Sequence, residues 1–146
     1  MKRHLWAILF AIAALAASVA PASAAPAARF VAATADAGTL PPTTQFAHAY
    51  TVTNVGDAPG AFGVWETFGT ALTVITIQSP DCAIYYGSLK GGGKVQAGVY
   101  CKGPVLNPGQ SITYSSTLKT KFGSACANVS VNDRSIRSGF WCVTVG

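Results

Sequence analysis

A strand of alternating side chains that runs directly into a tight turn is the feature that most limits how this chain can fold. Within residues 46–53, the larger side chains share one face of an extended strand, and these are Phe46, His48, Tyr50 and Val52. The next residues, 54–60, include Asn, Gly, Asp and Pro, which favour turns. This pattern predicts the first central strand of an antiparallel β-sandwich.

Short runs of the same kind, separated by turn residues, fill the rest of the chain. Beyond residue 24, no stretch repeats apolar residues at the 3.6-residue period of a helix. The sequence therefore predicts an all-β fold, an immunoglobulin-like antiparallel β-sandwich of seven or eight strands. In the run 72–78 the core-facing positions are ambiguous, which indicates a β-bulge. The expected strands cover residues 46–53, 61–68, 72–78, 82–86, 98–102, 111–120, 124–131 and 137–145.

The first residues have the composition of a cleavable export signal. A basic start at residues 2–4 precedes an uncharged apolar run at 5–19, and residues 22–24, Ala-Ser-Ala, form a small-residue cleavage site. This pattern predicts a secretory signal peptide in residues 1–24. The apolar run is shorter than the roughly 20 residues that cross a bilayer. We therefore expect a secreted or periplasmic protein with no membrane span in its mature form.

The remaining residues divide into two parts by composition. Residues 25–44 contain a short strand-like centre at 29–31 and the pair Pro41 and Pro42. Because proline is excluded from the interior of a sheet, this part is expected to be an edge strand followed by a proline-rich connector. Residues 45–146 make up the expected sandwich domain.

All four cysteines follow the signal peptide, and an even number in an exported chain favours two disulfides. Their spacings of 19, 25 and 16 positions lack the close pairs of a zinc site. If Cys126 faces Cys142, the centre of their hairpin falls inside a predicted turn. The same reasoning for Cys82 and Cys101 places the centre inside a run of glycines. We therefore predict that Cys82 pairs with Cys101 and Cys126 with Cys142.

Positive charge is modest and scattered once the signal peptide is set aside. Eight Lys and Arg residues then face five Asp and Glu residues. The cations lie near three different hairpins, around residues 90–102, 119–121 and 134–137. Since nucleic-acid-binding proteins gather their basic residues on one face, this pattern predicts no nucleic-acid partner.

His48 is the only histidine after the signal peptide, and it lies on the core-facing side of its strand. A catalytic base would need a nucleophile and an orienting carboxylate beside it. The favoured interpretation is a packed and hydrogen-bonded imidazole. No run of alternating Asp or Asn residues provides the oxygen ligands of a calcium site. We therefore expect no catalytic residues, no metal, no cofactor and no enzyme activity.

The run 61–68 leaves open which of its faces is buried. Phe62, Glu66 and their neighbours on one face oppose Trp65 and its neighbours on the other. Because a charged side chain is rarely buried without a partner, we expect Trp65 to point inward as the core tryptophan of the sandwich and Glu66 to stay outside the core.

Three tyrosines of the hairpin predicted at residues 82–102 form part of a possible binding surface. Tyr85 and Tyr86 are adjacent, so one of them is expected to face away from the core, and Tyr100 lies on the returning strand. Such rings can stack on a sugar. The favoured interpretation is a cross-strand aromatic pair that stabilises an edge hairpin.

Two lysines at the tip of this hairpin complete the possible binding surface. Lys90 and Lys94 flank three glycines. The tip lacks the Lys-Ser/Thr step and the following helix of a phosphate-binding loop, which indicates a flexible turn.

Three stretches carry a resemblance to a known family. They are residues 50–56 (Tyr-Thr-Val-Thr-Asn-Val-Gly), the Gly-rich hairpin between Cys82 and Cys101, and residues 106–111 (Leu-Asn-Pro-Gly-Gln-Ser). In this order and spacing they resemble the bacterial immunoglobulin-like repeat domains of unknown function found in cell-surface proteins. The resemblance covers about residues 45–131. It implies a β-sandwich with an adhesive or spacer role at a cell surface, and it provides no catalytic residues.

Two functions follow from these observations as hypotheses. The first is an exported, non-catalytic module that binds a protein or a cell-surface partner through an exposed sheet face or edge. The second is a secreted β-sandwich that binds a small ligand or a carbohydrate. A concave apolar pocket would favour the second, and a flat exposed patch would favour the first.

Overall fold

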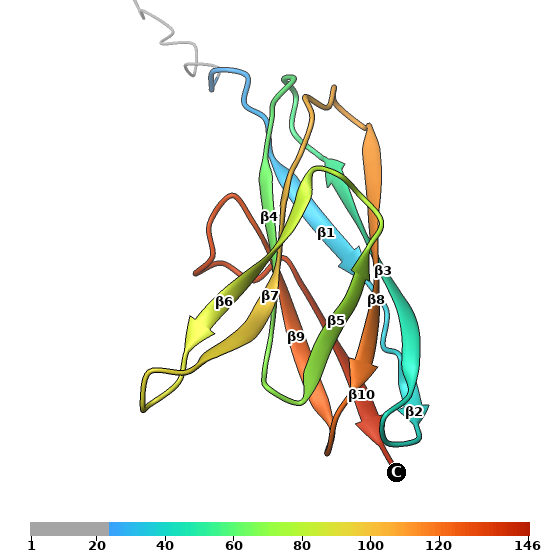
Figure 1. Ribbon diagram of the computed structural model, residues 1–146. Helices are drawn as coiled ribbons and strands as arrows, with labels where there is room; N and C mark the ends of the chain where they lie inside the picture. Colours follow the sequence, from blue (N-terminus) through green and yellow to red (C-terminus); the bar gives the residue numbers. More distant parts are fainter. Residues whose placement is uncertain (1–23) are drawn as a thin grey trace, which may run out of the picture.

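The computed structural model describes residues 24–146 of the chain. The predicted signal peptide, except for its last residue, lies outside the described residues. The described residues form ten strands in two sheets, so the expected count of seven or eight was wrong (Figure 1). In chain order the strands are β1 (Phe30–Thr34), β2 (Gly38–Leu40), β3 (Gln45–Asn54), β4 (Gly63–Phe68), β5 (Leu72–Ile77), β6 (Cys82–Ser88), β7 (Lys94–Lys102), β8 (Ser111–Thr120), β9 (Ala125–Val131) and β10 (Gly139–Val145).

One sheet has four antiparallel strands in the order β1-β3-β8-β5. β3 is the alternating strand that the sequence predicts, and it pairs with β8 without interruption from Gln45 opposite Lys119 to Thr53 opposite Ser111. The register between β5 and β8 shifts between Val74 and Thr76, which confirms the predicted bulge.

The other sheet has six strands in the order β2-β10-β9-β4-β7-β6. β2 lies in the segment that was expected to be only a connector, and it pairs in parallel with β10. A strand of three residues is too short to show a two-residue period, so the sequence pattern missed it. β2 and the edge strand β1 are the two strands beyond the expected eight.

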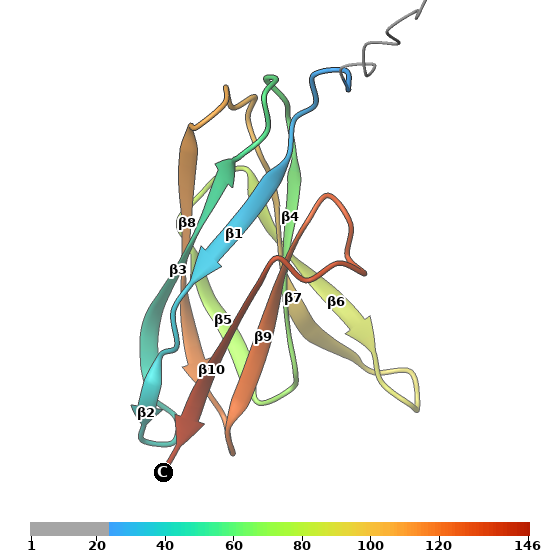
Figure 2. The same ribbon diagram turned by 180° about the vertical axis from the view of Figure 1, so that it is seen from behind.

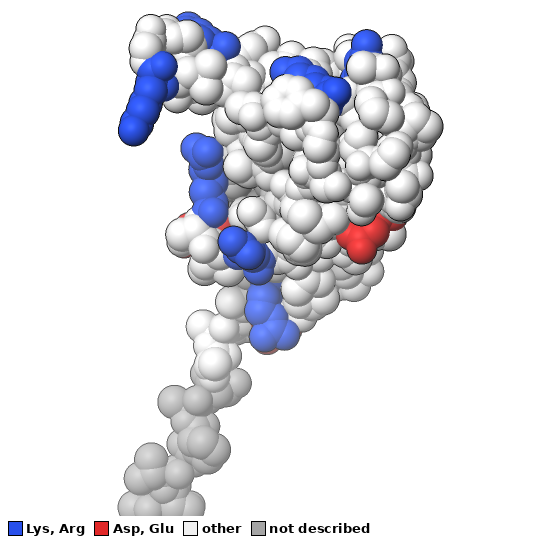
Figure 3. Space-filling model, turned by 90° about the horizontal axis from the view of Figure 1, so that it is seen from below, with Lys and Arg blue, Asp and Glu red and all other residues white. Residues whose placement is uncertain are grey.

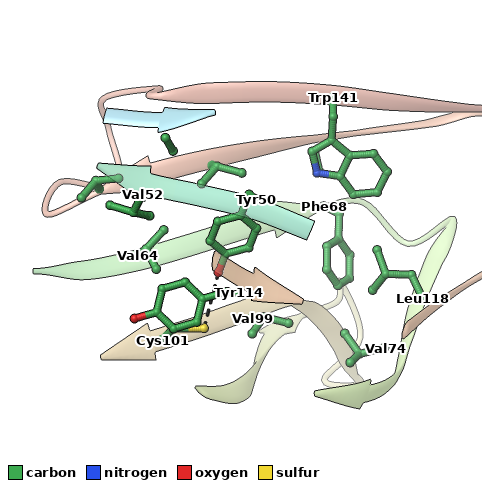
Figure 4. Packing of buried hydrophobic residues seen from close by; sticks show 14 of the residues in the cluster. Tyr50, Val52, Val64, Phe68, Val74, Val99, Cys101, Tyr114, Leu118 and Trp141 are labelled. Carbon is green, nitrogen blue, oxygen red and sulfur yellow. Dashed lines mark hydrogen bonds between the residues drawn. The ribbon is translucent and has the colours of Figure 1, made fainter. Parts of the chain in front are cut away.

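The two sheets enclose one hydrophobic core, to which both contribute alternate side chains. Figure 4 shows Phe68, Leu118 and Trp141 facing one another inside it, beside Tyr50 and Cys101. The fully buried tryptophan is Trp141, at 0% exposure, whereas Trp65 is half-buried. The expectation that Trp65 fills the core was therefore wrong.

Both disulfides join the predicted pairs, Cys82 with Cys101 and Cys126 with Cys142. In each case the two cysteines are direct partners in the register of adjacent antiparallel strands. Antiparallel pairing brings opposite Cβ atoms close enough for a disulfide, so each bond fixes the register of one hairpin.

The β6–β7 hairpin projects from one side of the sandwich in both the front and the back view (Figures 1 and 2). The back view also shows β1 and β10 crossing one face of the molecule side by side with β9. Among residues 24–146, no helix is long and apolar enough to cross a membrane.

Candidate functional site

The outer face of the six-stranded sheet, which points away from the core, carries an unusual set of aromatic side chains. Strand register places Trp65 of β4 between Tyr100 of β7 and Ser130 of β9. Tyr100 also faces Ala83 of β6. These positions form one row across the sheet. We call the group Trp65, Tyr85 and Tyr100 the outer aromatic face.

A second row runs parallel to the first, two residues further along each strand. In this row Tyr85 of β6 faces Gly98 of β7, and Gly98 faces Thr67 of β4. Thr67 in turn faces Asn128 of β9, which faces Phe140 of β10. Aromatic, hydroxyl and amide side chains are thus brought to one surface from five strands.

Trp65 and Tyr100 are in direct contact, with ring centroids 4.9 Å apart and an angle of 38° between the rings. Gly63 lies beside this pair. A Cβ atom at Gly63 would come within 3.0 Å of the Tyr100 hydroxyl oxygen and 3.4 Å of the Trp65 ring. The absence of a side chain at Gly63 therefore lets the two rings pack close to the backbone of β4.

Tyr85 reaches across β7 to the neighbouring strand. Its hydroxyl forms a short hydrogen bond with the Thr67 hydroxyl, and its ring passes over Gly98. A Cβ atom at Gly98 would lie 2.6 Å from the Tyr85 hydroxyl oxygen and would overlap the Glu66 carbonyl oxygen. Glycine is thus required at this position for the tyrosine to lie along the sheet.

The loop between β9 and β10 folds over the same face. It brings the guanidinium carbon of Arg134 to 4.9 Å from the centre of the Tyr85 ring, a cation–π contact. The β9–β10 loop and the sheet enclose a hollow of about 460 Å³, which we call the arginine hollow. Its lining residues are Thr67, Asn128, Ser130, Arg134, Ser135 and Arg137.

The charges at the arginine hollow are predominantly positive. Within the described part of the chain, neither Arg134 nor Arg137 lies within 4.0 Å of a carboxylate. The nearby carboxylate of Asp133 instead accepts hydrogen bonds from the backbone N–H and the hydroxyl of Ser135. These hydrogen bonds hold the pKa of the Asp133 carboxyl below its ordinary value.

The basic character of the surface extends beyond this loop. In the view from below, Lys and Arg side chains are spread along the left and the upper edge of the visible surface, whereas Asp and Glu show in only a few places (Figure 3). The remaining visible surface is largely uncharged, as the low share of charged residues in the sequence requires.

The main polar cluster in the core is separate from this face. His48 is 5% exposed, and its Nε2 lies 2.9 Å from the Thr34 hydroxyl oxygen. Its Nδ1 lies 2.9 Å from Oε1 of Glu66, without the alignment of a hydrogen bond. Trp141 donates its indole N–H to the same Glu66 oxygen and stacks on the imidazole, with centroids 3.9 Å apart.

Glu66 is 0% exposed, so the expectation that it stays outside the core was wrong. Phe62, Val64 and Phe68 alternate with the outward residues of the same run, and burying all three carries Glu66 inward with them. Trp141 donates to Oε1 of Glu66 and His48 lies beside the same oxygen, whereas the buried Oε2 has no hydrogen-bond partner among the described residues. The prediction of a packed, hydrogen-bonded His48 agrees with this arrangement.

A hydroxyl, an imidazole and a carboxylate in sequence are also the parts of a hydrolase triad. Here the imidazole and the carboxylate are buried between the two sheets. A substrate could reach them only if the two sheets separated. Tyr50 lies in the same interior, and burial, reinforced by the charge of Glu66, raises the pKa of its hydroxyl above the ordinary value.

The predicted binding residues do not form one patch. Tyr85 and Tyr100 lie on the outer aromatic face, but they face Gly98 and Ala83 rather than each other. Tyr86 follows a register shift and is 57% exposed. Lys90 and Lys94 lie at the exposed tip of the hairpin, which projects from the sandwich (Figure 1).

Several residues of this surface were not anticipated. Trp65 was assigned to the core, and Arg134 and Arg137 were treated only as scattered charges near a turn. Three of the four side chains on one face of the run 61–68 are apolar, namely Phe62, Val64 and Phe68. This pattern could have predicted that their face is buried and that Trp65 points away from the core. No sequence pattern shows that the β9–β10 loop returns over the sheet.

Among residues 24–146, no group of three or more His, Cys, Asp or Glu side chains is arranged to hold a metal ion. The groups that the candidate site offers to a ligand are aromatic rings, guanidinium groups, hydroxyls and an amide.

No protein-family model matches the sequence, and no curated protein sequence is significantly similar to it. Several solved structures are similar in fold. A Pseudomonas fluorescens alkylpurine DNA glycosylase, AlkC, matches 80% of this chain over 30% of its own length, with 14% identity and a TM-score of 0.50. A Listeria innocua β-glucosidase matches 82% of this chain over 16% of its own length, with 16% identity and a TM-score of 0.50.

A type I cohesin from Pseudobacteroides cellulosolvens matches 80% of this chain and 92% of its own, with 11% identity and a TM-score of 0.47. This chain spans less than a third of the AlkC and β-glucosidase chains. At these identities, the likeness to those two proteins shows a common β-sandwich fold alone.

Proposed function

We propose that this protein is an exported, non-catalytic, immunoglobulin-like module that binds a protein or cell-surface partner through its outer aromatic face. The observation that carries the proposal is the Trp65–Tyr100 ring pair, which lies on the outside of a sheet whose inner face already fills the core. Large aromatic side chains contribute most of the energy at many interfaces. The ring pair lies beside the arginine hollow, because Trp65 faces Ser130 of its lining, so a partner could contact both together.

The two disulfides support export, because such bonds persist in oxidising compartments. They fit a secreted or periplasmic location, as expected from the signal peptide at residues 1–24. Together with the all-β sandwich, they also fit the proposed kinship with bacterial immunoglobulin-like repeat domains of cell-surface proteins.

The non-catalytic part of the proposal rests on where the reactive side chains lie. His48 and Glu66, the groups best arranged for proton transfer, are enclosed in the core. The arginine hollow beside the outer aromatic face presents arginines, hydroxyls and an amide, which are groups that bind and orient a ligand. We assign no cofactor to the protein.

Carbohydrate binding is the second candidate function. It is favoured by the arginine hollow, where Thr67, Ser130 and Asn128 place hydrogen-bonding groups next to the Trp65–Tyr100 pair. Sites for small polar ligands combine flat rings with a few polar groups in this way.

Binding to isolated cell envelopes of the producing organism tests the proposed function. We expect the Trp65→Ser variant to bind at least about tenfold more weakly than the parent, the loss that follows when one central aromatic anchor is removed. The matched control is Phe122→Ser, which removes an aromatic ring that is 66% exposed in the loop between β8 and β9. Equal binding by the parent and the Trp65 variant would contradict the proposal. Circular dichroism verifies that both variants remain folded.

A further inference from the structure

The arginine hollow combines features that specify the chemistry of a ligand more narrowly than the aromatic rings alone. Its floor is formed by the outward residues Thr67 on β4 and Asn128 and Ser130 on β9. Its wall is the β9–β10 loop, which contributes Arg134 and Arg137. We propose that the hollow binds the carboxylate-bearing ring of an acidic polysaccharide, a uronate, while a neighbouring ring of the same chain stacks on Trp65 and Tyr100. This inference rests on the proposed function and names its ligand class.

The two guanidinium groups point to an anionic ligand. No described carboxylate lies within ion-pairing distance of Arg134 or Arg137, so both keep their donors free. Arg134 is also held in place by its contact with the Tyr85 ring. A guanidinium binds a carboxylate through two parallel hydrogen bonds, and it loses less entropy when it is already positioned. The acidic residue next to Arg134 in the chain is Asp133, and its carboxylate accepts hydrogen bonds from the backbone N–H and the hydroxyl of Ser135.

The floor of the hollow points to a ligand rich in hydroxyls. The Thr67 hydroxyl already bonds the Tyr85 hydroxyl and the Ser130 hydroxyl donates to the Arg134 carbonyl oxygen, so each keeps only its remaining acceptor capacity for a ligand. The side-chain oxygen of Asn128 is buried in this floor and accepts no hydrogen bond from any described residue. A buried acceptor without a donor costs free energy, and a rotation of the Asn128 side chain towards the hollow would let a sugar hydroxyl supply the missing donor.

The aromatic pair lies where a second sugar ring would continue from the hollow. Trp65 precedes Thr67 by two residues on the same strand and the same face, which is a distance of about 6.6 Å along β4. One face of a pyranose ring consists of C–H groups, and it packs on an aromatic ring without needing hydrogen bonds. The order of groups on the sheet therefore matches two consecutive units of a polysaccharide.

An acidic peptide or a nucleic acid would match only part of this arrangement. A peptide carboxylate would pair with the arginines, but every other side chain that lines the hollow carries a hydroxyl or an amide, which a sugar uses more fully than a peptide does. A nucleic acid would satisfy both the arginines and the rings, but it favours a continuous basic track for its phosphates, and only two cations line this hollow.

Isothermal titration calorimetry with the purified protein tests the inference. The probes are tetramers of α-1,4-galacturonate, β-1,4-glucuronate and β-1,4-mannuronate, together with the methyl ester of the galacturonate tetramer as the uncharged comparison. We expect at least one free uronate to bind and the ester of the galacturonate tetramer to bind at least about tenfold more weakly than its free acid, in line with the loss of charge-assisted hydrogen bonds. The affinity should also fall as salt is raised.

The double variant Arg134→Gln, Arg137→Gln should lose at least about tenfold in uronate affinity. The matched control, Lys119→Gln with Lys121→Gln, removes the same charge from the end of β8 in the other sheet and should bind within about twofold of the parent. A single-stranded oligonucleotide and a poly-glutamate peptide are titrated as competing polyanions.

The inference is overturned if no uronate binds, if the ester binds as well as the acid, or if the arginine variant binds as well as the parent. It is also overturned if the oligonucleotide or the poly-glutamate binds more tightly than every uronate. In any of these cases, Trp65-dependent binding to cell envelopes would still support the proposed function. Loss of that envelope binding would instead reject the proposed function.

Discussion

Nδ1 of His48 lies 2.9 Å from Oε1 of Glu66 in the interior of the sandwich, and the two residues come from different sheets. Trp141 donates its indole N–H to the same oxygen, and Thr34 bonds the far side of the imidazole. The cluster therefore links β1 and β3 of the four-stranded sheet to β4 and β10 of the six-stranded sheet. It is one of the polar connections between the sheets, together with the hydrogen bond between the Tyr50 hydroxyl and the Cys101 sulfur.

Replacing Glu66 with leucine should destabilise the protein strongly. The change leaves the indole N–H of Trp141 and the Nδ1 side of His48 buried without the carboxylate. Breaking a buried pair by removing one partner costs about 3 to 5 kcal/mol. Guanidinium unfolding with both disulfides intact measures the loss in the free energy of unfolding.

The double variant Glu66→Leu, His48→Leu serves as its control. An apolar pair of suitable volume often replaces a buried ionic pair at little cost, so the double variant should recover part of the stability. A loss below about 1 kcal/mol in the single variant would show that the cluster contributes little.

Two of the five tyrosines should ionise abnormally late in an alkaline titration. Burial raises the pKa of Tyr50 and, together with the charge of Asp81, raises that of Tyr114. In the unfolded chain both ionise near pH 10. Their contribution to stability is therefore complete below that pH and is lost as the pH rises above it.

Absorbance of tyrosinate near pH 11 measures this behaviour. Tyr50→Phe and Tyr114→Phe should each remove one late-ionising group from the titration curve. Ionisation of all five tyrosines together near pH 10, while circular dichroism shows a folded protein, would contradict the packing described for the core.

Gly98→Ala should disturb the outer aromatic face. A methyl group at this position would overlap the Glu66 carbonyl oxygen and lie 2.6 Å from the Tyr85 hydroxyl oxygen. Since the first of these atoms belongs to the backbone, we expect a loss of about 1 to 3 kcal/mol in the free energy of unfolding. Thermal or chemical unfolding measures it.

Gly87→Ala is the matched control in the same hairpin. Its added methyl group would meet its nearest neighbour, Cβ of Ala97, at 3.4 Å, which is close to ordinary contact. This variant should remain within about 0.5 kcal/mol of the parent. Similar losses in both variants would mean that the close packing of β7 against Tyr85 is not the cause.

Removal of the Cys126–Cys142 disulfide by paired serine substitutions should lower the free energy of unfolding by about 3 kcal/mol, the value for a closed loop of this size. Both sulfur atoms lie on the outer side of the sheet, so the change leaves the core intact. Chemical unfolding of the variant and the parent, both under non-reducing conditions, gives the difference. A loss below about 1 kcal/mol would show that the β9–β10 hairpin keeps its register without the bond.

Strand patterns in the sequence predicted most of the framework. The alternation at Phe46, His48, Tyr50 and Val52 placed β3 correctly. A strand has only two faces, and the side chains on one of them were clearly larger than those on the other. Cysteine positions predicted both disulfides, since direct partners on a hairpin are symmetric about its turn.

The candidate site was predicted only in part. Tyr85 and Tyr100 were singled out, but the contact of Tyr100 with Trp65 depends on which strand lies beside β7, and that neighbour, β4, is distant in sequence. Glu66 was misplaced for the same reason. Its neighbours, His48 and Trp141, come from other parts of the chain, so the strand pattern alone could not show that a buried carboxylate would find polar groups in the core.

The parallel pairing of β2 with β10 has a consequence for how the molecule is assembled. Gly38 lies beside Val143, so β2 finds its neighbour only in a segment that is far away along the chain. Contacts between such distant segments slow folding. The polypeptide must therefore keep one sheet border open until β10 reaches it, and closing that border would be a late step towards the native state.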